Sequence, residues 1–161
     1  MTTAWVPLAT ITLSSSAASV TFGSIPSGYR DLVLTITGAT TSSDTVIKMN
    51  FNNDTADVYA YVQMYGETSG AGSDSNTLEN IFAIMGGTGS IGTVVFNIMD
   101  YSATDKHKTV LARENNLGIS WTGARTTRWP STAAINEIDL TPRSGSFATG
   151  CVVSLYGSNR L

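Results

Sequence analysis

Hydrophobic and polar residues alternate with a period of two along most of this chain. Near its end, for example, Ile138 and Leu140 alternate with Glu137 and Asp139. Such alternation is typical of strands that have one buried and one exposed face. Segments with this pattern include 9–13, 20–22, 32–37, 47–51, 59–65, 93–101, 107–113, 117–121 and 151–157. The pattern predicts strands throughout and leaves almost no room for helix.

Turn-forming residues separate these segments at intervals of roughly 8 to 12 residues, a spacing that favours a sandwich or barrel. Pro26 and Gly28 mark one such turn, and the segment GETSGAGSDSN at 66–76 has the composition of an exposed loop. We therefore predict an all-β fold, a jelly-roll-like antiparallel β-sandwich of about eight to ten short strands. No linker or internal repeat divides residues 1–161, so we expect a single domain, with 1–8 as an N-terminal arm and Trp5 as its apolar anchor.

Composition supports strands and turns and argues against several classes of partner. Apolar residues make up 42% of the 161 residues and charged residues only 13%, while 19 Ser and 23 Thr supply about a quarter of the chain. The net charge of −3 has no basic cluster, so we expect no nucleic-acid partner. The N-terminal segment lacks the pattern of a secretory signal, and no apolar run is long enough to span a membrane. We expect a protein assembled in a cytoplasm, without a membrane partner.

Residues that could carry catalysis are few and badly placed. Gly87, Gly89 and Gly92 have the spacing of a dinucleotide-binding loop, but the strand-like segment TVVFNIM follows them instead of the required helix. The single histidine, His107, lies in the polar segment TDKHK and is expected to be solvated. The single cysteine, Cys151, is expected to be a small buried side chain. One His and one Cys cannot form a zinc site. We expect no catalytic residue, cofactor or metal ion.

A cluster of asparagine and aspartate residues allows a calcium site as an alternative to a simple turn. Asn50, Asn52, Asn53, Asp54 and Asp57 could surround a calcium ion, although their spacing does not match an EF-hand and a turn explains them equally well.

Two pairs of acids have the residue types of glycosidase catalysis, namely Asp54 with Asp57 and Glu137 with Asp139. Nothing in the sequence indicates a raised pKa or a cleft, so we interpret both pairs as solvated.

Large aromatic residues are the remaining chemical feature. We select Trp5, Tyr59, Tyr61, Trp121 and Trp129 as candidate interface residues. Exposed aromatic rings can bind protein partners or the apolar faces of sugars, and buried ones fill a core. Glycan binding therefore stays open beside a packing role.

Several segments resemble a group of small β-rich virion proteins encoded by tailed bacteriophages. The segments are ATITLSSSAASVTFGSIPSGYRDLVLTITG, MNFNNDTADVYAYVQMYG, YSATDKHKTVLAR and WPSTAAINEIDLTPRSGSFATGCVVSLYG, and together they cover most of the chain. The last is the most specific, because TAAIN, SGSFATG and SLYG occur in order.

This resemblance implies a structural role in a virion and no catalytic residues. The expected function is capsid decoration, in which a cement protein stabilises the shell by binding the major capsid protein or other virion proteins. The alternatives are a short tail-fibre, baseplate or host-recognition module, and a carbohydrate-binding module. By analogy, a homotrimer is expected. The absence of a coiled-coil or repetitive shaft favours the capsid over a long fibre.

Overall fold

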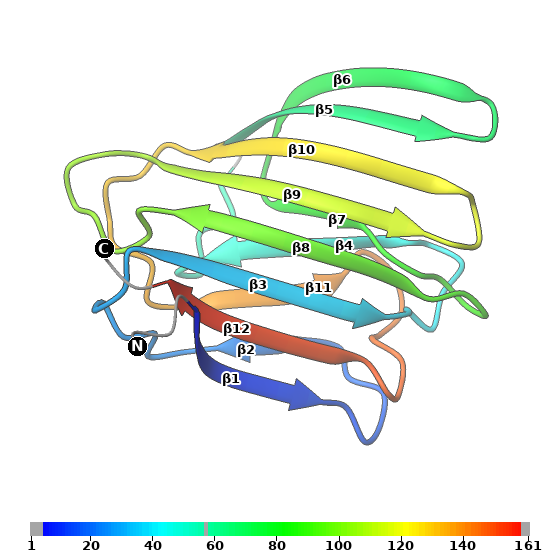
Figure 1. Cartoon of the computed structure of the whole chain (residues 1–161), viewed down its shortest axis with the longest axis horizontal. Coiled ribbons are helices and arrows are strands. Elements are labelled where there is room, and N and C mark those ends of the chain that lie inside the picture. Colours follow the sequence, from blue (N-terminus) through cyan, green and yellow to red (C-terminus); the bar gives the residue numbers. More distant parts are fainter. Residues whose placement is uncertain (1–4, 57, 159–161) are drawn as a thin grey trace.

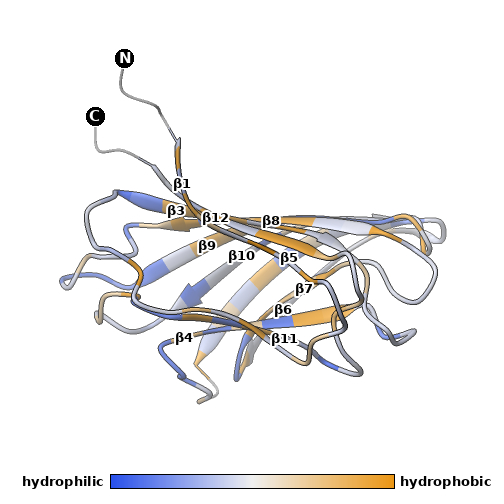
Figure 2. Ribbon diagram, turned by 90° about the horizontal axis from the view of Figure 1, so that it is seen from below, coloured by the Kyte–Doolittle hydropathy of each residue, from blue (hydrophilic) through white to orange (hydrophobic). Residues whose placement is uncertain are grey.

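The computed structural model describes residues 5–56 and 58–158, and these form two antiparallel sheets packed face to face. Among the described residues there is no helix long and apolar enough to cross a membrane. Figure 2 shows one broad curved layer on one side of the molecule and β4 and β11 on the other. The fold is a jelly-roll-like β-sandwich, as the alternation predicts.

The large sheet has eight strands and the small sheet has four. In spatial order the large sheet contains β1 (Trp5–Thr12), β12 (Val152–Ser158), β3 (Asp31–Gly38), β8 (Gly92–Met99), β9 (Lys108–Asn116), β10 (Trp121–Trp129), β5 (Tyr59–Glu67) and β6 (Gly70–Leu78). The small sheet contains β2 (Val20–Phe22), β11 (Ile138–Pro142), β4 (Val46–Phe51) and β7 (Ile81–Ile84).

The small sheet covers only part of the large one. In Figure 1 its four strands lie behind β12, β3, β8 and β9, whereas β5 and β6 extend past β7 at the top. Apolar side chains between the two layers form the core, including Leu34, Phe96 and Val153 on the large sheet and Met49 and Ile138 on the small one, all fully buried. The strand alternation places them there because every second side chain faces the other sheet.

Two sequence predictions about strands are corrected by the structure. The expected loop at 66–76 is mostly strand, because β6 pairs with β5 from Glu67↔Gly70 to Tyr59↔Leu78. Its side chains are small and exposed on the edge of the sheet, so no apolar alternation marks it. The expected strand at 117–121 is instead a turn, and β10 begins at Trp121. Glycine and arginine occupy inward positions of β10, which weakens its alternation.

The N-terminal segment also differs from the expectation of an arm. Trp5, Val6 and Pro7 pair with β12 as part of β1, with a bulge between Pro7 and Ala9. Residues 1–4 of the predicted arm lie outside the described residues. Two smaller expectations are confirmed: Cys151 is buried, and the glycine-rich segment at 86–92 leads into strand β8 and not into a helix.

Candidate functional site

A buried ion pair lies where the small sheet ends. Arg125 of β10 and Glu114 of β9 both face inward, and each side chain is only 1% exposed. Arg125 Nη1 lies 3.4 Å from Glu114 Oε2. Burying two charges is costly unless both are paired and hydrogen-bonded, so the surroundings of this pair matter.

The pair also hydrogen-bonds to two backbone groups of the edge strand β7. The amide of Ile84 donates to Glu114 Oε2 over 2.8 Å, and Arg125 Nη1 donates to the carbonyl oxygen of Phe82. An edge strand otherwise leaves such backbone groups without strand partners. The ion pair therefore links β9 and β10 of the large sheet to β7 of the small sheet.

Aromatic and amide groups surround the guanidinium. Arg125 Cζ lies 3.6 Å from the centroid of the Phe82 ring and 5.6 Å from that of Tyr61. Arg125 Nη2 donates to Gln63 Oε1, and the Tyr61 hydroxyl donates to Asp74 Oδ2 over 2.7 Å. These contacts hold β5 and β6 in place above β7 and make the network rigid.

Burial shifts the acidity of these groups. It raises the pKa of Glu114, although the charge of Arg125 and the Ile84 amide favour the carboxylate. Burial also lowers the pKa of Arg125, against the effect of Glu114. The pKa of Tyr61 is raised to about 12 by burial and by its hydrogen bond to Asp74. Glu114 accepts a hydrogen bond from the Ile84 amide and is paired with Arg125. We therefore interpret its raised pKa as the result of a structural ion pair.

A second aromatic contact lies beside this network. The rings of Tyr65 and Trp121 stack with centroids 4.4 Å apart, and Trp121 Nε1 donates to Glu114 Oε1 over 3.2 Å. Gly72 makes room for this stack, because a Cβ atom there would lie 2.6 Å from the Tyr65 hydroxyl oxygen. Both rings are half-buried.

The five aromatic residues selected from the sequence have different positions. Trp5 is 47% exposed, Trp121 is half-buried, and Tyr61 belongs to the buried network. Tyr59 and Trp129 are buried and stack on each other with ring centroids 6.4 Å apart. These two fill the core, which is the packing role that the sequence left open.

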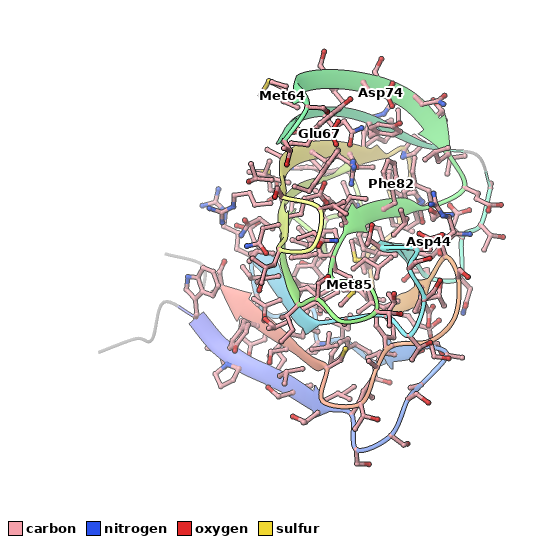
Figure 3. The ribbon with its side chains drawn as sticks, turned by 90° about the vertical axis from the view of Figure 1, so that its right-hand side faces the viewer. Asp44, Met64, Glu67, Asp74, Phe82 and Met85 are labelled. Carbon is pink, nitrogen blue, oxygen red and sulfur yellow. The ribbon has the colours of Figure 1, made fainter. Side chains whose placement is uncertain are left out.

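The outer face is the surface of the large sheet that points away from the small sheet. Four of the seven large hydrophobic side chains that are exposed among the described residues lie on it, namely Trp5, Met99, Val62 and Met64. Of the strand side chains described on this face, only Asp31, Arg113 and Arg128 are charged. Figure 3 shows Met64 on the outside of the β5–β6 hairpin. Threonine, serine and alanine supply most of the other positions.

Two shallow hollows indent this outer face. One, of about 330 Å³, is lined by Trp5, Val33, Met99 and Leu111 among others. The other, of about 430 Å³, lies beside Arg113. A nearly uncharged sheet surface with exposed apolar side chains and such hollows is suited to contact with another protein.

The asparagine-rich turn after β4 is held by its own hydrogen bonds. Asn52 and Asn53 have positive φ angles of 52° and 58°. Asn52 Nδ2 donates to the carbonyl oxygen of Ala134 over 2.8 Å, and Asp54 Oδ2 accepts from Trp129 Nε1 over 2.7 Å. These contacts match the turn interpretation of the sequence. Asp57 lies outside the described residues, and the described part contains no group of three metal-ligating His, Cys, Asp or Glu side chains.

The other candidate residues lie apart from this network. Glu137 Oε1 accepts from Asn53, and Asp139 Oδ1 accepts from the Thr21 hydroxyl over 2.6 Å. His107 is exposed, as expected. Its neighbour Lys108 is fully buried, and Nζ donates to the carbonyl oxygen of Lys106 over 2.9 Å. Burial lowers the pKa of Lys108.

Sequence reasoning missed the Arg125–Glu114 pair. One signal was present, because Glu114 shares the inward alternation of Val110 and Ala112. A charge in an apolar series indicates a buried charge that needs a partner.

No protein-family model and no curated protein sequence matches the chain. Among solved structures, an exo-inulinase from Aspergillus awamori has a TM-score of 0.51 at 10% identity; the alignment covers 94% of this chain and spans only 29% of the inulinase. Lactose-liganded congerin II has a TM-score of 0.38 at 14% identity, over 84% of this chain and 98% of congerin. A galectin from Caenorhabditis elegans has a TM-score of 0.34 at 10% identity, over 94% of this chain and 96% of the galectin. At these identities the likeness concerns the fold alone.

Proposed function

We propose that this chain is a structural protein of a tailed-phage virion, a capsid decoration protein that stabilises the shell by binding capsid subunits. The observation that carries the proposal is the outer face, where Val62 is 59% exposed and Met64 is 67% exposed. Exposed apolar side chains on a nearly uncharged surface, here in two pairs, Val62 with Met64 and Trp5 with Met99, favour burial against a partner.

The size of the outer face suits a stable protein contact. Seven spacings between eight strands give a width of about 34 Å, and seven residues of strand give a length of about 24 Å. The resulting area of roughly 800 Å² equals the surface that one partner contributes to a typical specific interface. Binding at that face adds free energy to the assembled shell, as ligand binding adds to the stability of a folded protein.

Deletion of the gene tests this function. We expect particles without the protein to lose their DNA at lower temperature than complete particles, and electron microscopy to locate the domain on the capsid in stoichiometric amounts. Intact particles of equal heat stability would contradict capsid decoration. Density at the tail, with altered adsorption to the host, would support a tail-fibre or host-recognition module instead.

By analogy with the virion proteins that the chain resembles, we propose that it forms a homotrimer, one of the closed cyclic forms of homo-oligomers. Sedimentation equilibrium of the purified chain at several concentrations measures this directly. A mass of three chains is the expected result, and a monomer at all concentrations would contradict it.

A further inference from the structure

A cavity lies between the end of β6 and the small sheet, separate from the outer face. Its volume is about 320 Å³, at the lower end of the range of small-molecule sites. Val46, Leu78 and Phe82 form an apolar wall, and Lys48, Glu79 and Arg143 carry its charges. Figure 3 shows Phe82 beneath the β5–β6 hairpin, with Asp74 above it and Asp44 below it.

The aromatic part of this wall is held rigidly. Arg125 Cζ lies 3.6 Å from the centroid of the Phe82 ring, and the ring of Tyr61 meets it edge-on at 5.0 Å. A ring fixed from two sides loses little conformational entropy when a ligand packs on it. Phe82 is therefore a preorganised surface for an apolar ligand face.

Asn80 gives the cavity an unused polar group. It lines the cavity, is only 8% exposed, and its side chain makes no hydrogen bond to any residue that the structure describes. A buried side-chain amide normally has partners for its two donor hydrogens and its acceptor oxygen. The Asn80 amide atoms are not among the described buried side-chain atoms that lack a partner, so they are open to the cavity, where a polar ligand can bind them in place of water.

The charges at the cavity favour one carboxylate on that ligand. Lys48 Nζ lies 3.8 Å from Glu79 Oε1, a long and partly exposed contact that contributes little. Arg143 Nε donates to Asp44 Oδ2 over 2.7 Å. Arg143 is therefore already paired, whereas Lys48, held only by its long contact, can receive a carboxylate, and Glu79 offers an acceptor for hydroxyl groups.

We propose that this cavity binds a carboxylated sugar residue, such as a hexuronate. The apolar face of the sugar ring packs on Phe82, its hydroxyl groups bind Asn80 and Glu79, and its carboxylate binds Lys48. This site does not depend on the proposed role in a virion, since it uses the opposite side of the large sheet from the outer face.

The proposal is tested by titrating the full chain with glucuronate and, separately, with glucose, followed by amide NMR. For a ligand of this size we expect a Kd on the order of 1 mM. Glucuronate should shift the amides of Glu79, Asn80 and Phe82 and bind about tenfold more tightly than glucose, which corresponds to one charge-assisted contact.

Three variants make the test specific. Asn80→Ala should weaken glucuronate binding about tenfold with an unchanged Tm, because Asn80 bonds no described residue, and Lys48→Ala should remove the preference for glucuronate over glucose. Asn136→Ala, an exposed asparagine outside the cavity, is the matched control and should bind like the original chain. No saturable shift at about 10 mM glucuronate, equal affinity for both sugars, or full affinity in Asn80→Ala would each overturn the proposal.

Discussion

The two halves of the large sheet's inner face are built from the same alternation but from different chemistry. Where the small sheet covers it, strands β12, β3 and β8 contribute apolar side chains such as Leu34 and Phe96, which are fully buried. Beside the edge strand β7, strands β9, β10 and β5 also contribute Glu114, Arg125 and Gln63, which are buried next to apolar residues such as Val110. A sheet can thus bury one half against a second sheet and the other half against an edge strand.

The difference between the halves follows from what each half faces. A second sheet presents side chains, so apolar surfaces on both layers satisfy each other. The free edge of β7 presents backbone groups, and these need hydrogen-bonding partners. Arg125 and Glu114 supply such partners, at the cost of burying two charges.

Glu114→Leu is expected to produce the largest loss of stability. It leaves the Arg125 charge buried without its carboxylate and removes the acceptor of the Ile84 amide, so the free energy of unfolding should fall by about 3–5 kcal/mol. Urea titration of the variant measures this change. The double variant Glu114→Leu/Arg125→Met should recover part of the loss, because no unpaired charge is then buried. A single variant as stable as the original chain would show that the pair does not hold the two parts together.

A smaller effect is expected from alkaline pH through two of the buried tyrosines, Tyr59 and Tyr61. Burial raises the pKa of Tyr59 to about 12, and burial together with Asp74 raises that of Tyr61 to about 12, against 10.0 for an ordinary tyrosine. Below pH 10 both rings are neutral in the folded and unfolded chains, and their full contribution to stability is present. Between pH 10 and 12 only the unfolded chain loses these protons, so stability falls, by about 2–3 kcal/mol for the fully buried Tyr59.

Urea titrations at several pH values between 10 and 12 measure this decrease. Tyr59→Phe and Tyr61→Phe should each show a shallower decrease than the original chain, whatever their stability at neutral pH. Equal slopes in all three proteins would contradict the assignment of the decrease to these hydroxyl groups.

On the apolar half, Ile36→Val should cost only about 0.5–1.5 kcal/mol, because one methyl group is removed from a fully buried side chain and no charge is exposed. Thermal unfolding measures this loss. A cost as large as that of Glu114→Leu would remove the contrast between the two halves.

The apolar half is also the part that the sequence predicted. Alternation at Leu34 and Ile36 of β3, and at Ile138 and Leu140 of β11 in the small sheet, follows because the two sheets cover each other, and the structure confirms their burial. An apolar side chain is usually buried, so its residue type alone predicts its environment. The prediction of a two-layer sandwich therefore rested on residues that report their environment directly.

The polar half could not be predicted in the same way. Arg125 and Gln63 are far apart in sequence, and a buried charge is defined by partners that only the tertiary fold supplies. Strand β6 was missed because its side chains are small and exposed, so its pairing with β5 leaves no apolar pattern. The open cavity beside Asn80 depends on the approach of β6 to the small sheet, which no local pattern encodes.

The smallest effect on stability is expected on the outer face. Val62→Glu/Met64→Glu places two charges at positions that are already exposed, so each should change the free energy of unfolding by no more than about 0.5 kcal/mol. Thermal unfolding of the double variant checks this. A large loss of Tm would mean that these side chains support the fold and are not free for a partner.

Co-sedimentation with tailed-phage particles that lack this gene tests the central claim most directly. The original chain should sediment with the particles at a fixed stoichiometry, and so should Thr149→Glu, which adds a charge to an exposed loop outside the strands. Val62→Glu/Met64→Glu should lose at least about tenfold in affinity, since its charges would be buried in the contact. Undiminished binding by that double variant, or no sedimentation of the original chain, would contradict assembly through the outer face.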